Sequence, residues 1–193
     1  MSKGALVFVF SANVDPYVNA IVHFFAEHHI DEVIFVEIRE PPIPSPPDFG
    51  QLVDSIWESM CLLAGGRYRD RRGSMSDLTG DYSVYEQLVD RLSRQVHRES
   101  ILYHDLRKEL VRLRGKYGEA ISVDITGVPK RLAADILASG LAAGIEDIFL
   151  FELKERYDGR RPMDFLYHNL DNAKFDHVRL PDSAPMIANL TLF

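Results

Sequence analysis

Four short apolar runs dominate the hydrophobic pattern of this 193-residue chain. They are rich in valine, isoleucine and phenylalanine, hardly alternate with polar residues at their centres, and cover Ala5–Phe10, Glu32–Ile38, Ala120–Ile125 and Asp147–Leu153. Strands that are covered on both faces, as in parallel sheets, have this pattern. The runs therefore predict four strands of a mainly parallel sheet.

Apolar residues at helical spacing fill the segments between these runs. Asp15 and Pro16 predict a helix N-cap followed by a proline at the first helical position, and an apolar side follows from Ile21 to Phe25. The spacing from Leu52 to Leu63 predicts a second helix. A strand, a helix and a strand of this length make a βαβ unit, which crosses over right-handed.

The middle of the chain has weaker patterns. Five prolines between residues 41 and 47 exclude regular structure there. Residues 65–81 are glycine-rich, basic at their start and without periodicity, which is typical of a long mobile or binding loop. Residues 82–117 are charged and predict helix, with a break near Glu99 and Ser100. We therefore expect a helical insertion at about 48–117.

The end of the chain predicts an antiparallel extension. A turn at Tyr157–Arg160 lies between two strand-like runs, and the tail after it suits one or two extended pieces. The predicted fold is α/β, with a Rossmann-like, mainly parallel sheet flanked by helices and a C-terminal β-hairpin extension. We expect a Rossmann-like domain over residues 1–153 and its extension over 154–193.

Composition narrows the range of functions. The net charge of −7 argues against broad, non-specific binding to DNA, RNA or anionic membranes. The single cysteine, Cys61, forms no internal disulfide and is expected to be buried. The seven histidines show no metal-ligand spacing, so no metal or cofactor is predicted. With no secretory signal pattern and no membrane-spanning run, we expect a soluble, cytoplasmic protein.

Two loops follow predicted strands and lead into helices, at 11–16 and at 126–131. In parallel α/β sheets, ligands bind beyond the carboxyl ends of the strands. Lys130 and Arg131 stand where a helix begins, although the partial positive charge of a helix N-terminus favours acids there. A bound anion explains both cations, because helix N–H groups and a lysine together make a phosphate site. The alternative is that they point to water or pair with Asp124 or Asp135.

The two loops resemble the paired signatures of CARF domains, the CRISPR-associated Rossmann-fold sensors. The family's second signature is Asp-x-Thr-Gly-Gly-Thr-Lys before a helix, and residues 124–130 read Asp-Ile-Thr-Gly-Val-Pro-Lys with the same spacing. The family's first loop often ends in an Asp-Pro pair, as Asp15 and Pro16 do here. The resemblance covers residues 5–153.

This resemblance implies a homodimer that binds a cyclic oligoadenylate, or a related nucleotide, across its twofold axis in antiviral defence. Some family members also cleave this ligand without metal, and for that ring nuclease activity the resemblance implies Lys130 and Ser11 as catalytic residues. The implied ligand-binding residues are Ser11, Ala12, Asn13, Asp124, Thr126, Gly127, Val128, Lys130 and Arg131.

Two departures from the signature leave alternatives open. Val128 replaces its second glycine and Pro129 its second threonine, so the site is narrower, takes another nucleotide, or is degenerate. With a degenerate pocket, the chain is a non-binding module that contacts a protein or an RNA segment through the basic loop at 65–73.

Overall fold

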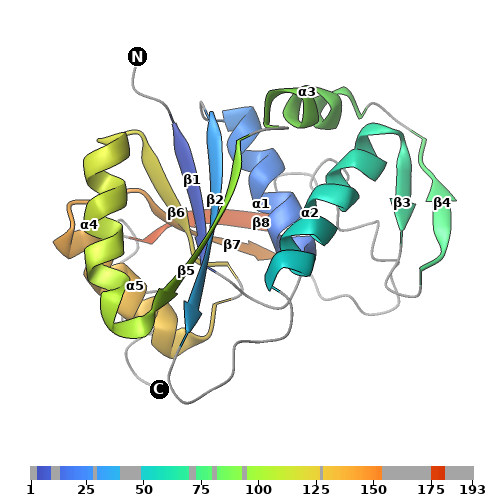
Figure 1. Cartoon of the computed structure of the whole chain (residues 1–193). Coiled ribbons are helices and arrows are strands. Elements are labelled where there is room, and N and C mark those ends of the chain that lie inside the picture. The colour runs from blue at the N-terminus through green and yellow to red at the C-terminus, as the bar shows by residue number, and fades with distance from the viewer. Residues whose placement is uncertain are drawn as a thin grey trace.

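A six-stranded sheet forms the centre of the molecule (Figure 1), with the strand order β5-β2-β1-β6-β7-β8. The computed structural model describes residues 4–9, 14–27, 30–39, 49–69, 73–79, 82–92, 95–126, 128–153 and 175–180. The strands are β1 (Ala5–Val9), β2 (Glu32–Arg39), β5 (Val96–Leu102), β6 (Ile121–Asp124), β7 (Ile148–Leu153) and β8 (Phe175–Arg179). The first five strands in the order run parallel, and β8 is antiparallel to β7. The predicted α/β class with a Rossmann-like sheet is confirmed.

Helices cover both faces of this sheet (Figure 1). One face carries α1 (Val14–Glu27), α2 (Phe49–Ala64) and α3 (Ser83–Leu92), and the other carries α4 (Leu106–Tyr117) and α5 (Lys130–Ala142). Strand β1 serves both layers, because Leu6 and Phe8 face the first group of helices while Val7 and Val9 face the second. Full burial of each such side chain stabilises the fold by about 1.5–3 kcal/mol.

The four predicted strands are confirmed, each to within one residue at either end. Helix α1 begins at Val14, so Asp15 lies inside the helix and the predicted N-cap there is wrong. Pro16 then lies within the first turn, where it is tolerated because the N–H groups of that turn have no partner in the helix. The predicted helix at 52–63 is α2, and Val53, Ile56, Met60 and Leu63 are buried.

Part of the chain that was predicted to be helical is a strand. Strand β5 occupies the place of the predicted break and forms the edge of the sheet beside β2. As an edge strand it carries polar residues on both faces. Arg98 is paired with Asp54 on α2, while His97 and Glu99 face α4. Its neighbour η1 (Tyr103–Asp105) is a single 3₁₀ turn that leads into α4.

The predicted long loop at 65–81 contains a small antiparallel ribbon, made of β3 (Arg67–Arg69) and β4 (Met75–Asp77). Tyr68 is buried and joins the cluster of α1, α2 and α3, which ties this ribbon to the domain. Cys61 on α2 is exposed, and the prediction of burial is wrong. The buried stripe of α2 runs through residues 53, 56, 60 and 63 and leaves position 61 outside it.

Strand β8 pairs antiparallel with β7, the last parallel strand, which confirms the antiparallel character of the predicted C-terminal extension. The predicted turn at Tyr157–Arg160 and the proline-rich segment at 41–47 lie outside the described residues. Within the described ranges, no helix combines the length and the apolar character that crossing a membrane requires.

Candidate functional site

The order of the strands reverses between β1 and β6. From β1 the chain passes through α1 to β2 on one side, while β6 flanks β1 on the other side. Phe8 is aligned with Asp124, so both strands end at the same edge of the sheet. In doubly wound sheets, ligands bind at such a switch point, beyond the carboxyl ends of the strands. The two predicted loops therefore leave from neighbouring strands at the expected place.

A tight turn follows β6. The Thr126 N–H donates to Asp124 Oδ1 at 2.8 Å, and the Val128 N–H donates to the Ile125 carbonyl at 3.2 Å. Asp124 is fully buried, and Thr126 is 6% exposed. Because both side chains are turned into the protein, they form the turn rather than an open ligand surface.

Helix α5 begins directly after this turn. Pro129 is its N-cap residue and makes no side-chain cap, and the Ala133 N–H donates to the Pro129 carbonyl at 2.9 Å. The N–H groups of Lys130, Arg131 and Leu132 therefore have no partner within the helix. The first turn holds no acidic residue.

The two departures from the family signature have local explanations here. Val128 packs against the core cluster beneath α5, so its side chain contributes to packing. Pro129 lacks an N–H, but it precedes the first helical residue, and so the free N–H groups of the first turn are unaffected. Neither residue removes the helix N-terminus as a place for an anion.

The structure bears on the alternative partners of the two cations. Asp135 accepts a hydrogen bond from the Tyr103 hydroxyl, and Asp124 is engaged in the turn. Arg131 is exposed and forms no ion pair with any acid in the described part of the chain. Its charge is therefore not neutralised by the two acids that the sequence suggested.

On the β1 side, the Tyr17 hydroxyl donates to the Val9 carbonyl at 3.0 Å and fixes the end of the strand against α1. Sequence reasoning missed this bond, because a tyrosine on an apolar helix face gives no signal of its partner. Ser11, Ala12, Asn13 and Gly127 lie outside the described residues, as does the side chain of Lys130. Their convergence on one site stays a prediction.

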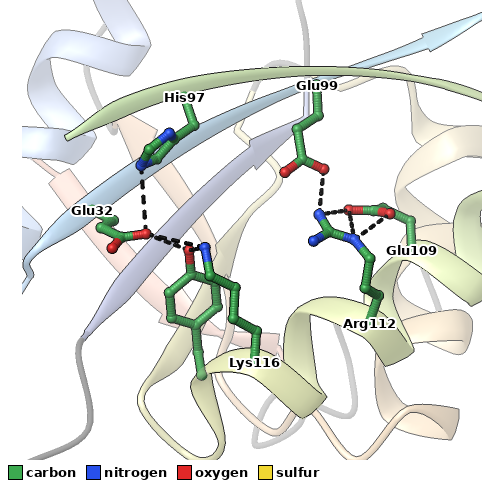
Figure 2. A network of polar contacts seen from close by, with 7 residues as sticks. Glu32, His97, Glu99, Glu109, Arg112 and Lys116 are labelled. Atoms are coloured by element: carbon green, nitrogen blue, oxygen red, sulfur yellow. Dashed lines mark hydrogen bonds and ion pairs between the residues drawn. The ribbon is translucent and has the colours of Figure 1, made fainter. Parts of the chain in front are cut away.

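A polar network that the sequence did not predict lies between α4 and the strands β2 and β5 (Figure 2). Its first part surrounds Glu32, which is 5% exposed and accepts a hydrogen bond from the Tyr117 hydroxyl. Lys116 Nζ lies 3.4 Å and His97 Nε2 3.5 Å from the same carboxylate oxygen. Burial, followed by the bond to Glu32, raises the pKa of Tyr117, and the bond to Tyr117 raises the pKa of Lys116.

The second part centres on Arg112, which lies between two glutamates (Figure 2). Its Nε is 2.9 Å from Glu109 Oε2, and its Nη2 is 2.5 Å from Glu99 Oε2. Burial, followed by the bond with Glu109, raises the pKa of Glu99. Burial also acts to raise the pKa of Glu109, but hydrogen bonds from Arg112 and Glu99 lower it overall. The pKa values of the two carboxyl groups are thus shifted in opposite directions, and the charged form is favoured only at Glu109.

Among the described residues, no three histidine, cysteine, aspartate or glutamate side chains come together in a way that suits a metal ion. Comparison with known proteins found no protein-family model and no curated sequence that matches the chain.

Proposed function

We propose that this protein binds a cyclic oligoadenylate, or a related nucleotide, at the switch point between β1 and β6. The observation that carries the proposal is the first turn of α5, which has two cations, no acid and no side-chain cap. Three N–H groups without helical partners and two positive charges suit a phosphate group. The resemblance of the loops at 11–16 and 124–130 to CARF signatures supports a nucleotide as the carrier of that phosphate.

In this proposal the ligand is symmetric and lies across the twofold axis of a homodimer. Each subunit contributes Lys130 and Arg131 to phosphates, and Ser11 and Asn13 to ribose or base. Asp124 and Thr126 act indirectly by holding the turn, in keeping with their burial. Val128 contributes to the packing of the turn rather than to the ligand surface, in keeping with its contact with the core.

Calorimetry with cyclic oligoadenylates of several ring sizes tests the proposal. We expect one ring size to bind with a stoichiometry of one ligand per two chains. Lys130→Ala should weaken binding about tenfold or more, because hydrogen bonds to charged groups contribute about 1.5–3 kcal/mol. Arg107→Ala is the matched control, since Arg107 is an exposed cation on α4. No heat and no thermal shift with any ring size would falsify the proposal.

Cleavage of the ligand is a separate proposal, in which Lys130 stabilises the developing charge and Ser11 positions the ribose. Protein and ligand are incubated with a chelator, and linear products are separated by chromatography. Linear products that disappear with Lys130→Ala support the ring nuclease. Binding without any linear product identifies a sensor, and cleavage that survives Lys130→Ala excludes this residue.

The ribbon of β3 and β4 favours a second candidate function, contact with a protein or RNA partner. Arg67 and Arg69 alternate with buried Tyr68 and are exposed, although Arg69 is 2.7 Å from Glu58 on α2. A partner that is captured equally by the wild type and by Lys130→Ala, but lost with Arg67→Ala, would support this interaction module. Loss with Lys130→Ala instead would assign the capture to the nucleotide site.

A further inference from the structure

A cavity lies at the same edge of the sheet as the proposed nucleotide site, but beside the ends of β2 and β5. Its volume is about 420 Å³, which falls in the range of small-molecule sites of about 300–1,000 Å³. Strands β2 and β5 end here in register, with Arg39 opposite Leu102, and the first turns of α4 close the other wall. The described lining residues are Arg39, Ser100, Ile101, Leu102, Asp105, Lys108, Glu109 and Arg112. We call this the β5–α4 cavity.

Three cations and two acids line the β5–α4 cavity. Glu109 is paired with Arg112, and Asp105 Oδ2 lies 3.5 Å from His104 Nε2, a contact that is an ion pair only when the histidine is protonated. Arg39 and Lys108 are exposed, and neither forms an ion pair with another residue in the described ranges. Two positive charges that have no ion-pair partner among the described residues thus line one cavity of a chain whose net charge is −7.

Arg112 adds an oriented donor to these charges. Its Nε and Nη2 are held by Glu109 and Glu99 at 2.5–3.0 Å, which fixes the plane of the guanidinium group. Its Nη1 makes no hydrogen bond to a described residue, and two N–H donors are therefore available. A guanidinium that is fixed in advance loses less entropy when it binds an oxyanion.

We propose that the β5–α4 cavity is a second site, which binds a small phosphate-bearing molecule through Arg39, Lys108 and Nη1 of Arg112. A phosphate monoester carries about −1.5 to −2 charges at neutral pH and three strong acceptor oxygens, which matches two unpaired cations better than a single carboxylate does. The site is independent of the proposed nucleotide site, because it uses no residue of the α5 turn.

Nuclear magnetic resonance of the ¹⁵N-labelled chain tests this site with three probes: inorganic phosphate, AMP and adenosine. We expect phosphate and AMP to shift the amide signals of Ser100, Ile101 and Leu102, and adenosine to leave them unchanged. Arg39→Ala combined with Lys108→Ala should weaken AMP binding about tenfold, since each exposed ionic contact contributes about 0.2–1 kcal/mol and the two act on one group. Equal shifts with adenosine and AMP would overturn the proposal.

Matched variants separate this site from general charge and from the α5 turn. Arg107→Ala removes a cation from the neighbouring position on α4, which does not line the cavity, and should leave AMP binding unchanged. Glu99→Gln keeps a side-chain oxygen that can accept the hydrogen bond from Arg112 but removes the negative charge beside it, so it should strengthen binding about two- to fivefold. Lys130→Ala should leave these shifts intact, and their loss in this variant would show that the signals belong to the other site.

Discussion

One carboxylate oxygen at the end of β6 holds the turn on which the proposed nucleotide site depends. Asp124 Oδ1 accepts the Thr126 N–H in the interior of the protein, where water cannot replace it. The signature at 124–130 therefore encodes backbone geometry as much as ligand contact. The Asp-Ile-Thr-Gly pattern at 124–127 was enough to predict a turn here, but it did not show that the aspartate is buried.

Asp124→Ala should lower the free energy of unfolding by about 1–3 kcal/mol, because it leaves a buried N–H without its acceptor. Asp124→Asn keeps an oxygen at the same position and should lose less than half as much. Unfolding in urea, followed by circular dichroism, measures both values. Equal losses in the two variants would mean that the charge of Asp124, and not its hydrogen bond, stabilises the turn.

At the scale of elements, the sequence predicted buried strands well and edge elements poorly. β1, β2, β6 and β7 stand out because both of their faces are covered, which requires apolar residues throughout. In β5, polar residues reach partners on the flanking helices, and so Val96–Leu102 resembles the charged helices beside it. β3 and β4 have three residues each, too few for a period to be seen.

The contact between β5 and α4 should respond to pH with opposite signs at its two glutamates. The ordinary pKa of a glutamate is 4.5, and the pKa of Glu99 is raised in the folded protein. The contribution of Glu99 to stability is therefore present below pH 4.5 and is lost as the pH rises through its pKa in the folded protein. Glu99→Gln should therefore match the wild type at low pH and gain stability relative to it as the pH rises. Urea unfolding at several pH values between about 4 and 7.5 measures the difference in the free energy of unfolding between the two proteins.

Glu109 is the matched control, because its pKa is lowered. Its contribution is present above 4.5 and is lost as the pH falls through its folded pKa. Glu109→Gln should consequently be less stable than the wild type near neutrality and approach it at low pH. Two variants with the same sign of pH dependence would contradict the assignment of the two carboxyl groups.

Helix α5 approaches β7 closely at a glycine. A Cβ added to Gly140 would lie 2.7 Å from Ile148 Cδ1, and Ile148 is fully buried. Gly140→Ala should cost about 1–3 kcal/mol in overpacking, offset by about 1 kcal/mol of helix propensity. Ile148→Val removes the opposing Cδ1 and should itself cost about 0.5–1.5 kcal/mol.

The double variant Gly140→Ala with Ile148→Val distinguishes the clash from a loss elsewhere in the helix. Valine leaves room for the new methyl group. The loss in the free energy of unfolding of the double variant should therefore be smaller than the sum of the two single losses by about 0.5–3 kcal/mol. Thermal or urea unfolding of all four proteins completes the cycle. Strict additivity would show that α5 and β7 adjust to the methyl group without this contact.

At the scale of the whole molecule, the strand order matters more than any single element. It places β1 at the centre, hydrogen-bonded to β2 and β6 and covered on both faces (Figure 1). The class of the fold followed from the sequence, because it depends on local patterns. The order of the strands did not, because it depends on β5, whose partners are distant in sequence.

This arrangement predicts a gradient of amide hydrogen exchange across the molecule. The amides of Leu6–Phe8 in β1 should exchange only through global unfolding, since opening them exposes both layers of the core. Those of β3 and β4 pair only with each other within the described sheets, and a local opening of this ribbon leaves the central sheet intact. They should therefore exchange on the order of 100-fold faster or more than those of β1.

Mass spectrometry of hydrogen exchange at low urea concentrations measures the protection of both regions in one sample. Equal protection of β1 and of the β3–β4 ribbon would mean that the ribbon is part of the cooperative core.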